Sequence, residues 1–307
     1  MRNRIWLISL IIPILSACSS AGVSPSTTGD SQTKTQTEMQ SETQLEPPAD
    51  QPESVVTAAA EPYRPLTQSY TFTVSDGTEL QGTFYPPEND NAPLIVLMHW
   101  ARGDQNDYTA IAGWLQNRGE VANDPTAQNA WQDASWFPKI DQGTSYGVFT
   151  FSFRDCEKGC AAFHSQEWLD DAQSALEFAR NLDYIDQDRI LVAGASIGAD
   201  GAADSCLYLN QAHPGSCKGA FSISPGSYLT ETYADVVNQL GEAQPAVPAV
   251  CLYAPSDSSA AAACADLQAD NYTSYPIGNA HGMDLIDPQV QPNPLDLLLT
   301  FIRENLE

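Results

Sequence analysis

Basic residues are scarce in this chain, which has 13 Lys and Arg against 39 Asp and Glu and a formal net charge of −26. A face that binds a nucleic-acid backbone needs positive charge, so this balance argues against nucleic acid as a partner. Long apolar runs are also lacking, because no stretch reaches the roughly 18 apolar residues that a membrane-spanning helix needs. The sequence has neither Cys and His at zinc spacing nor a glycine-rich phosphate loop, so we expect no metal and no cofactor.

The N-terminus has the pattern of an export signal. A basic start at residues 1–4 precedes a mostly apolar run at 5–15, which is too short to span a bilayer. The run ends in Leu15-Ser16-Ala17-Cys18, which resembles the bacterial lipoprotein box, where the Cys receives a diacylglyceryl group and becomes the mature N-terminus. The resemblance implies a signal peptide over 1–17 and a lipid anchor on Cys18. An ordinary signal peptide with a chance Cys is the alternative.

Residues 18–65 have the composition of a disordered tether. Ser, Thr, Gln, Pro and Glu dominate them, and large apolar groups are too few to offset the chain entropy of folding. Acyl chains on Cys18 would insert into a lipid membrane, and the tether would let residues 66–307 stand off its surface. Because Ser19 follows the Cys, where Asp would imply the inner membrane, the resemblance implies the outer membrane in a diderm bacterium. In other bacteria it implies the outer face of the cell membrane.

Residues 66–307 fit a single α/β domain in length. Residues 68–74 and 79–85 alternate between apolar and polar around the turn Asp76-Gly77, which indicates a β-hairpin. Downstream, apolar runs typical of buried strands alternate with segments of helical period. The strand candidates are 94–98, 147–153, 189–193, 220–224, 250–253 and 272–276, and the helix candidates are 108–118, 167–182, 197–209 and 295–302. This alternation predicts a mostly parallel sheet with helices on both faces and antiparallel strands at its N-terminal edge.

A Gly-x-Ser-x-Gly motif, Gly194-Ala195-Ser196-Ile197-Gly198, lies where a predicted strand turns into a predicted helix. Such a turn forces the Ser into a strained conformation that small neighbours accommodate, and it lifts the hydroxyl above the sheet. The hydroxyl would then lie near the positive end of the helix dipole. A plain strand–helix turn with glycines for packing is the alternative. In this context we predict that Ser196 is a nucleophile.

A serine nucleophile needs a general base, and the chain has only four histidines. His281 follows the last predicted strand, and Asp257 follows the strand before it. The carboxyl ends of parallel strands meet at one edge of a sheet, so both side chains should lie near Ser196. We therefore predict that His281 is the base and that Asp257 orients its imidazole. His99, which ends the strand at 94–98, is interpreted as structural.

The motif and the chain order of nucleophile, acid and base resemble the α/β-hydrolase family, near its dienelactone-hydrolase-like and esterase branches. The resemblance spans about residues 68–305 and implies two-step acyl transfer from a small-molecule ester, with no cofactor. Ser196 would attack the carbonyl, His281 would move the proton, and Asp257 would hold the imidazole. Dienelactone hydrolases proper have Cys in place of this Ser, so their lactone activity does not carry over.

The same resemblance implies an oxyanion hole. His99-Trp100-Ala101 occupies the place of the family's His-Gly-x loop, and Trp100 replaces the usual Gly. One donor would be the amide of Ile197, which follows the nucleophile. The second would be the amide of Ala101 or that of Trp100, and the sequence leaves this choice open.

Six cysteines remain once Cys18 is assigned to the lipid. Export favours oxidation, so we expect disulfides rather than metal ligation. The sequence leaves the choice among about fifteen pairings open, and the simplest joins sequence neighbours. These pairs are Cys156 with Cys160, Cys206 with Cys217, and Cys251 with Cys264.

Two further features have competing interpretations. Between residues 118 and 147 lies an insertion whose Trp131, Trp136 and Phe137 would either line an acyl pocket or pin the insertion onto the core. Asp200 and Asp204 follow the motif on its helix, and we interpret them as surface carboxylates.

The function predicted from the sequence is a membrane-anchored serine hydrolase that acts on carboxylic esters. A peptidase of the prolyl-oligopeptidase type is one alternative. A non-catalytic binding lipoprotein that retains the hydrolase fold is another, because an intact triad does not guarantee turnover.

Overall fold

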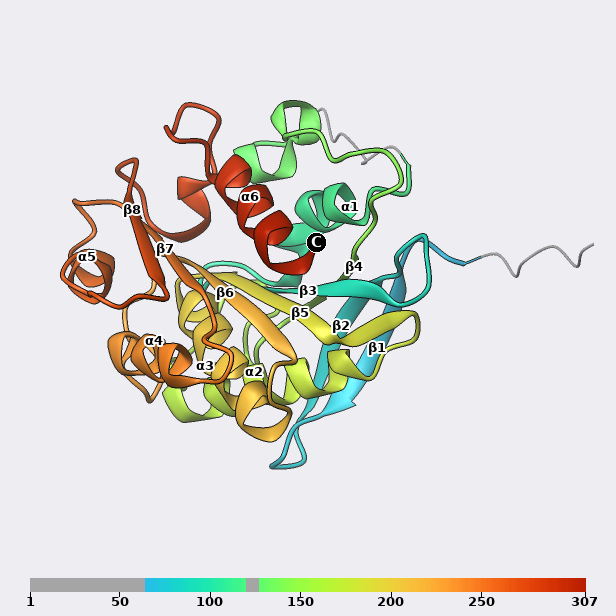
Figure 1. Ribbon diagram of the computed structural model, residues 1–307, viewed down its shortest axis with the longest axis horizontal. Helices are drawn as coiled ribbons and strands as arrows, with labels where there is room; N and C mark the ends of the chain where they lie inside the picture. The colour runs from blue at the N-terminus through green and yellow to red at the C-terminus, as the bar shows by residue number, and fades with distance from the viewer. Residues whose placement is uncertain (1–63, 120–126) are drawn as a thin grey trace, which may run out of the picture. The chain divides into compact units, whose positions relative to one another are not determined.

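A computed structural model describes residues 64–119 and 127–307 of the chain. The signal peptide, Cys18 and the tether up to residue 63 lie outside these described residues, and the predictions made for them stay predictions. The described residues form an eight-stranded sheet with helices packed against it (Figure 1). Among the described helices, none is long and apolar enough to cross a membrane.

The strands of the sheet have the order β1-β2-β4-β3-β5-β6-β7-β8. The β1–β2 and β2–β4 pairs are antiparallel, and all other neighbours are parallel. This arrangement confirms the predicted mostly parallel sheet with antiparallel strands at its N-terminal edge. The strands are β1 (Gln68–Thr73), β2 (Glu79–Tyr85), β3 (Ala92–Met98), β4 (Gly147–Phe151), β5 (Ile185–Ala195), β6 (Cys217–Ile223), β7 (Ala249–Tyr253) and β8 (Tyr272–Pro276).

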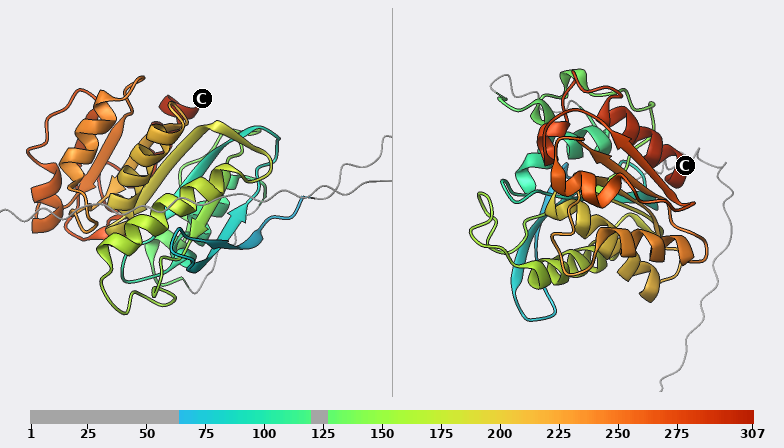
Figure 2. Two further views of the ribbon diagram at one scale, coloured as in Figure 1. Left: turned by 90° about the horizontal axis from the view of Figure 1, so that it is seen from below. Right: turned by 90° about the vertical axis from the view of Figure 1, so that its left-hand side faces the viewer.

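Helices cover both faces of the sheet, as predicted. The α-helices are α1 (Thr109–Gln116), α2 (Ser165–Arg180), α3 (Ile197–Ala212), α4 (Tyr233–Glu242), α5 (Ser258–Cys264) and α6 (Pro294–Leu306). Helices α1 and α6 lie on one face, and α2, α3 and α4 lie on the other (Figures 1 and 2). Each face has its own cluster of buried apolar side chains, because a sheet in this position buries both of its surfaces.

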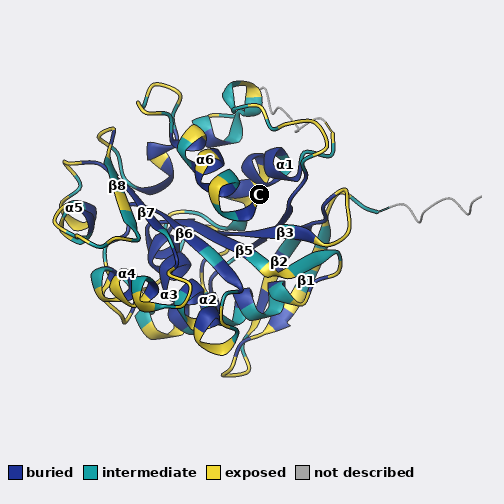
Figure 3. Cartoon of the chain, viewed as in Figure 1, coloured by how far each residue is buried: buried dark blue, intermediate teal, exposed yellow. Residues whose placement is uncertain are grey.

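The central strands are buried on both sides, which explains their unbroken apolar sequences. All residues of β4 are buried, and β3 is buried except at Pro93, whereas in β1 at the sheet edge every second residue is exposed and only Phe72 is buried. Figure 3 shows the buried central strands and, by contrast, the exposed outer surfaces of the helices. The turn between β1 and β2 closes through Gly77, whose φ of +91° suits glycine.

Two helices were not predicted from the sequence. Helix α4 has a recognisable start, since the Thr232 side chain accepts a hydrogen bond from the Asp235 amide. Its buried residues Tyr233, Val236, Val237 and Leu240 follow the helical period, so this signal was present and was missed. Helix α5 is only seven residues long and consists of Ser, Ala and Cys, a composition that shows no amphipathic pattern.

Three disulfides join sequence neighbours: Cys156 with Cys160, Cys206 with Cys217, and Cys251 with Cys264. The second joins α3 to the first residue of β6, and the third joins β7 to the end of α5. The first closes a short loop after β4, on the edge of the sheet where the parallel strands end.

Candidate active site

Ser196 stands alone between β5 and α3 in a strained backbone conformation, with φ 55° and ψ −117°. A non-glycine residue at positive φ is held there only by its surroundings. The flanking glycines allow close backbone contacts, since a Cβ at Gly198 would lie 2.2 Å from the Met98 carbonyl oxygen. A Cβ at Gly194 would lie 2.0 Å from the Gly198 carbonyl oxygen. The motif therefore builds a tight elbow against the end of β3.

The structure brings Ser196, His281 and Asp257 into one chain of hydrogen bonds. His281 Nδ1 lies 2.5 Å from Asp257 Oδ2, and His281 Nε2 lies 2.8 Å from Ser196 Oγ. A carboxylate accepts hydrogen bonds, so Nδ1 carries the proton and Nε2 is free to accept the Ser196 hydroxyl proton. The Ser196 residue is 6% exposed, and the side chains of His281 and Asp257 are 27% and 13% exposed. The three groups thus have the order and contacts that a nucleophile, base and orienting acid require.

Asp257 has a second contact that fixes its carboxylate. It is the N-cap of α5, where Oδ1 accepts from the Ala260 amide at 3.3 Å while Oδ2 faces His281. One oxygen therefore serves the helix and the other serves the imidazole.

The backbone next to His281 is held by a residue that sequence reasoning missed. The Gly282 amide donates to the hydroxyl of Ser224 at 3.0 Å, and Ser224 follows β6 with no exposed surface. Gly282 has φ +62°, and a Cβ there would lie 2.7 Å from Cε3 of Trp100. The signal for Ser224 was its position, since it is a polar residue directly after a buried strand at the carboxyl edge of the sheet.

His99 is structural, as interpreted from the sequence. It is fully buried, its Nδ1 lies 2.7 Å from the Trp100 carbonyl oxygen, and its Nε2 lies 3.0 Å from the Phe153 amide. The carbonyl requires a donor and the amide requires an acceptor, which fixes the neutral tautomer with the proton on Nδ1. Burial lowers the pKa of His99 to about 4, so the ring stays neutral near pH 7.

Of the predicted oxyanion donors, Ile197 directly follows Ser196 as the first residue of α3, and the segment with Trp100 and Ala101 follows β3. A Cβ at Gly198 would lie 2.6 Å from the His99 carbonyl oxygen, so the segment that leads to Trp100 and Ala101 starts against α3. Within the described part of the chain, the amides of Ile197, Trp100 and Ala101 donate to no backbone or side-chain acceptor, so this observation alone does not choose between Trp100 and Ala101. Amides with this freedom can bind a developing oxyanion.

Asp200 and Asp204 are buried, which corrects their interpretation as surface carboxylates. They are 2% and 5% exposed, because the chain after β6 covers this side of α3. The Asp200 carboxylate accepts hydrogen bonds from three successive amides of that segment, those of Gly226, Ser227 and Tyr228. Asp204 Oδ2 has no hydrogen-bond partner among the described residues.

Burial dominates the titration of both carboxyl groups. It raises the pKa of Asp200 to about 7, although the three amides favour the charged form and act in the opposite direction. Burial, with the negative charges of Asp200 and Glu231 acting in the same direction, raises the pKa of Asp204 to about 8. Asp204 therefore keeps its proton near pH 7. Of the two carboxyl groups, Asp200 is the one whose anionic form is favoured, because three amides donate to it.

The aromatic residues of the insertion pack onto the domain. Trp131 is 5% exposed and meets Trp100 edge to face, with ring centroids 5.7 Å apart. Trp136 and Phe137 are partly buried against the apolar cluster on the face of α1 and α6. These contacts agree with the pinning interpretation. Across residues 64–119 and 127–307, no group of three or more His, Cys, Asp or Glu is arranged to hold a metal ion.

Sequence comparison finds distant relatives. No family model matches the chain. A stretch of 141 residues is 26% identical to the uncharacterized protein YfhR of Escherichia coli, and it covers 45% of this chain and 40% of that protein. The YfhR protein of Salmonella typhimurium is 24% identical over 138 residues and is matched over 38% of its length. The chain thus spans about two fifths of the length of the curated relatives it matches.

Structure comparison finds esterases. The hyperthermophilic esterase of Pyrobaculum calidifontis has a TM-score of 0.50 and 16% identity, over 78% of this chain and 83% of that chain. A thermostable carboxylesterase cloned from a metagenomic library has a TM-score of 0.52 and 17% identity, over 78% and 89%. A thermostable esterase from Pseudomonas putida has a TM-score of 0.51 and 14% identity, over 78% and 83%. At these identities the likeness establishes the fold.

Proposed function

We propose that this chain, which has the α/β-hydrolase fold of those esterases, is a serine hydrolase that cleaves carboxylic esters of small molecules. The observation that carries the proposal is the hydrogen-bonded chain Ser196–His281–Asp257 at the strained elbow. A structural turn has no need of a base within 2.8 Å of the serine oxygen and of a carboxylate behind that base. The fold shared with esterases supports the same reaction class.

In the proposed reaction, the Ser196 oxygen attacks the ester carbonyl carbon while His281 Nε2 takes the hydroxyl proton. Asp257 keeps the proton on Nδ1 and stabilises the imidazolium that forms. The tetrahedral intermediate collapses, His281 gives its proton to the leaving alcohol, and an acyl-enzyme remains on Ser196. Water then attacks the acyl-enzyme by the same steps and releases the acid.

Negative charge develops on the carbonyl oxygen during each attack. The amides of Ile197 and Ala101 are proposed to bind it, and each such donor lowers the barrier by about 3 kcal/mol. We choose Ala101 over Trp100 because His99 donates a hydrogen bond to the Trp100 carbonyl. The Ala101 N–H belongs to the same peptide group and is therefore directed to the opposite side.

Fluorophosphonate labelling together with hydrolysis of short p-nitrophenyl esters tests this proposal. The wild type should be labelled and turn over the esters, and Ser196→Ala should lose both properties. Ser174→Ala, a matched change on α2, should keep them. An unlabelled, inactive wild type would favour a non-catalytic binding protein. Cleavage of peptide anilides in preference to esters would favour a peptidase.

Anchoring to the outer membrane of a diderm bacterium, or to the outer face of a single cell membrane, is a separate part of the proposal. It rests on the resemblance of residues 15–18 to a lipoprotein box. Cells fed radiolabelled palmitate should label the wild type, and the protein should pellet with membranes. Cys18→Ala should abolish the label and release the protein from the pellet. A wild type that is secreted unlabelled would contradict the anchor.

A further inference from the structure

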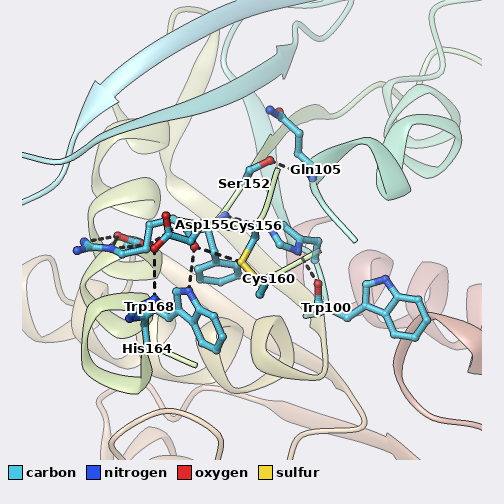
Figure 4. The surroundings of a disulfide bond; sticks show 12 residues. Trp100, Gln105, Ser152, Asp155, Cys156, Cys160, His164 and Trp168 are labelled. Carbon is cyan, nitrogen blue, oxygen red and sulfur yellow. Dashed lines mark hydrogen bonds and ion pairs between the residues drawn. A yellow bond between two sulfur atoms is a disulfide. The ribbon is translucent and has the colours of Figure 1, made fainter. Parts of the chain in front are cut away.

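The segment 99–105 carries the proposed second oxyanion donor, and a neighbouring loop, residues 152–160, holds it along its length. The Gln105 amide donates to the Ser152 hydroxyl at 3.3 Å, and the Phe153 amide donates to His99 at 3.0 Å. The Cys160 amide donates to the Ala101 carbonyl at 2.8 Å. Figure 4 shows Cys156 and Cys160 between Trp168 on one side and the segment with Trp100 and Gln105 on the other.

These contacts clamp both peptide groups that flank the Ala101 α-carbon. A trans peptide group is planar, and its N–H points away from its C=O. His99 binds the Trp100 carbonyl at 2.7 Å, so the Ala101 N–H is directed to the opposite side. The Cys160 amide binds the carbonyl of Ala101 itself and thereby fixes the next peptide group. The direction of the donor N–H depends on both clamps.

The two ends of the 152–160 loop are anchored unequally. On the Cys156 side, Arg154 forms an ion pair with the buried Asp171 at 2.6 Å, and Trp168 Nε1 donates to the Arg154 carbonyl at 3.2 Å. On the Cys160 side, residues 157 and 158 are exposed, and Gly159 has φ +90°. One hydrogen bond, from the Ala161 amide to the Asp155 carbonyl at 2.9 Å, also joins the two sides, and the disulfide adds the covalent link between the anchored side and Cys160.

We propose that the Cys156–Cys160 disulfide is a positioning element for catalysis, which keeps the Cys160 amide on Ala101 and the Ala101 N–H aimed at the oxyanion. This inference rests on the proposed ester hydrolysis. It gives the bond a role distinct from that of Cys206–Cys217, which joins α3 to the start of β6 at the opposite edge of the sheet.

The bond is also the one that a reductant should reach first. Cys160 is half-buried, whereas the other five disulfide cysteines are buried. A thiolate of a dithiol reductant attacks one sulfur, the S–S bond breaks, and the other cysteine leaves as a thiolate that takes a proton. The second thiol of the reductant then resolves the mixed disulfide, so that two electrons and two protons are transferred in total.

The test compares two double variants of the full chain, Cys156→Ala/Cys160→Ala and the control Cys206→Ala/Cys217→Ala. The first should lower kcat roughly 10- to 100-fold, since a donor misplaced by an ångström forfeits much of its effect. KM should stay within about twofold, and Ki for an alkyl trifluoromethyl ketone, which mimics the tetrahedral intermediate, should rise with the loss of kcat. The control should lower Tm and leave kcat and this Ki unchanged below the melting transition.

A second measurement uses the folded wild type. Mild dithiothreitol treatment, with mass spectrometry to identify the reduced pair, should lower kcat in step with loss of the Cys156–Cys160 bond, and reoxidation should restore it. If the enzyme is active and its kcat and ketone affinity do not change when this bond is lost, the inference is overturned and the proposed function is not. A wild type inactive on every ester would overturn the proposed function, and the inference with it.

Discussion

Asp257 contacts the base that faces Ser196, whereas Asp200 and Asp204 lie on α3, the helix that begins directly after Ser196. Asp257 is partly exposed and faces a partner that gains positive charge when it accepts a proton. Asp200 and Asp204 are buried on α3, where Asp200 accepts from backbone amides and its negative charge acts on Asp204. Under the proposed function, the partner decides the role of each carboxylate, because Asp257 would stabilise the positive charge that His281 gains during the reaction. Changing each to the isosteric amide separates these roles.

The largest effect is expected for Asp257→Asn. The amide cannot stabilise the imidazolium, and its NH2 group favours the His281 tautomer that leaves Nε2 protonated and unable to take the Ser196 proton. We expect kcat to fall by about 10⁴-fold, with KM little changed. Ester hydrolysis measured between pH 6 and 9 checks this, and a loss below tenfold would remove Asp257 from the proposed triad.

An intermediate effect is expected for Asp200→Asn. One amide oxygen cannot replace two carboxylate oxygens for three donors, so the segment at Gly226, Ser227 and Tyr228 loosens. The Tyr228 ring meets the His281 ring edge to face at 6.2 Å, so a looser segment disturbs the base. We expect a roughly tenfold lower kcat and faster hydrogen exchange at these amides. Unchanged exchange would show that Asp200 does not hold the segment.

The smallest effect on activity is expected for Asp204→Asn, which should instead change the pH dependence of stability. The pKa of Asp204 is raised to about 8 in the folded chain, so between about pH 4 and 8 the folded state binds a proton that the unfolded state releases. The free energy of unfolding of the wild type therefore falls as pH rises through this window. The variant lacks this titration and should be more stable than the wild type at pH 9, by about 1–3 kcal/mol.

Urea unfolding at pH 5, 7 and 9 measures this difference, with Asp296→Asn at the start of α6 as the control carboxylate. Parallel pH profiles for the wild type and Asp204→Asn would contradict the raised pKa. A large loss of kcat in the variant would contradict the separation between Asp204 and the reaction.

Short-range patterns predicted most of the fold and the proposed triad. Each strand and the elbow at Ser196 are marked by residues within a few positions, and the chain order placed Asp257 and His281 on the correct edge of the sheet. Helix α4 could also have been predicted, since Thr232 is a typical N-cap residue and the apolar residues after it recur at helical spacing.

The remaining features depend on contacts between residues far apart in the sequence. The amides that bury Asp200 come from residues 26 to 28 positions further along the chain. Ser224 and the Gly282 amide are 58 positions apart, and His99 and Phe153 are 54 apart. These contacts depend on how the irregular segments fold over the edge of the sheet, and no local sequence pattern predicts them.

Trp100 packs between the segment that carries His281 and Gly282 and the insertion that carries Trp131. Its ring contacts the α-carbon side of Gly282 and meets Trp131 edge to face, and its Nε1 donates to Asp107 at 2.8 Å. A library that randomises position 100 alone should yield mostly inactive members, since a smaller residue leaves a void between the segments of the base and the oxyanion donor. Joint variation of positions 100 and 131, with Gly282 kept because of its φ of +62°, is the route by which directed evolution could reshape this site.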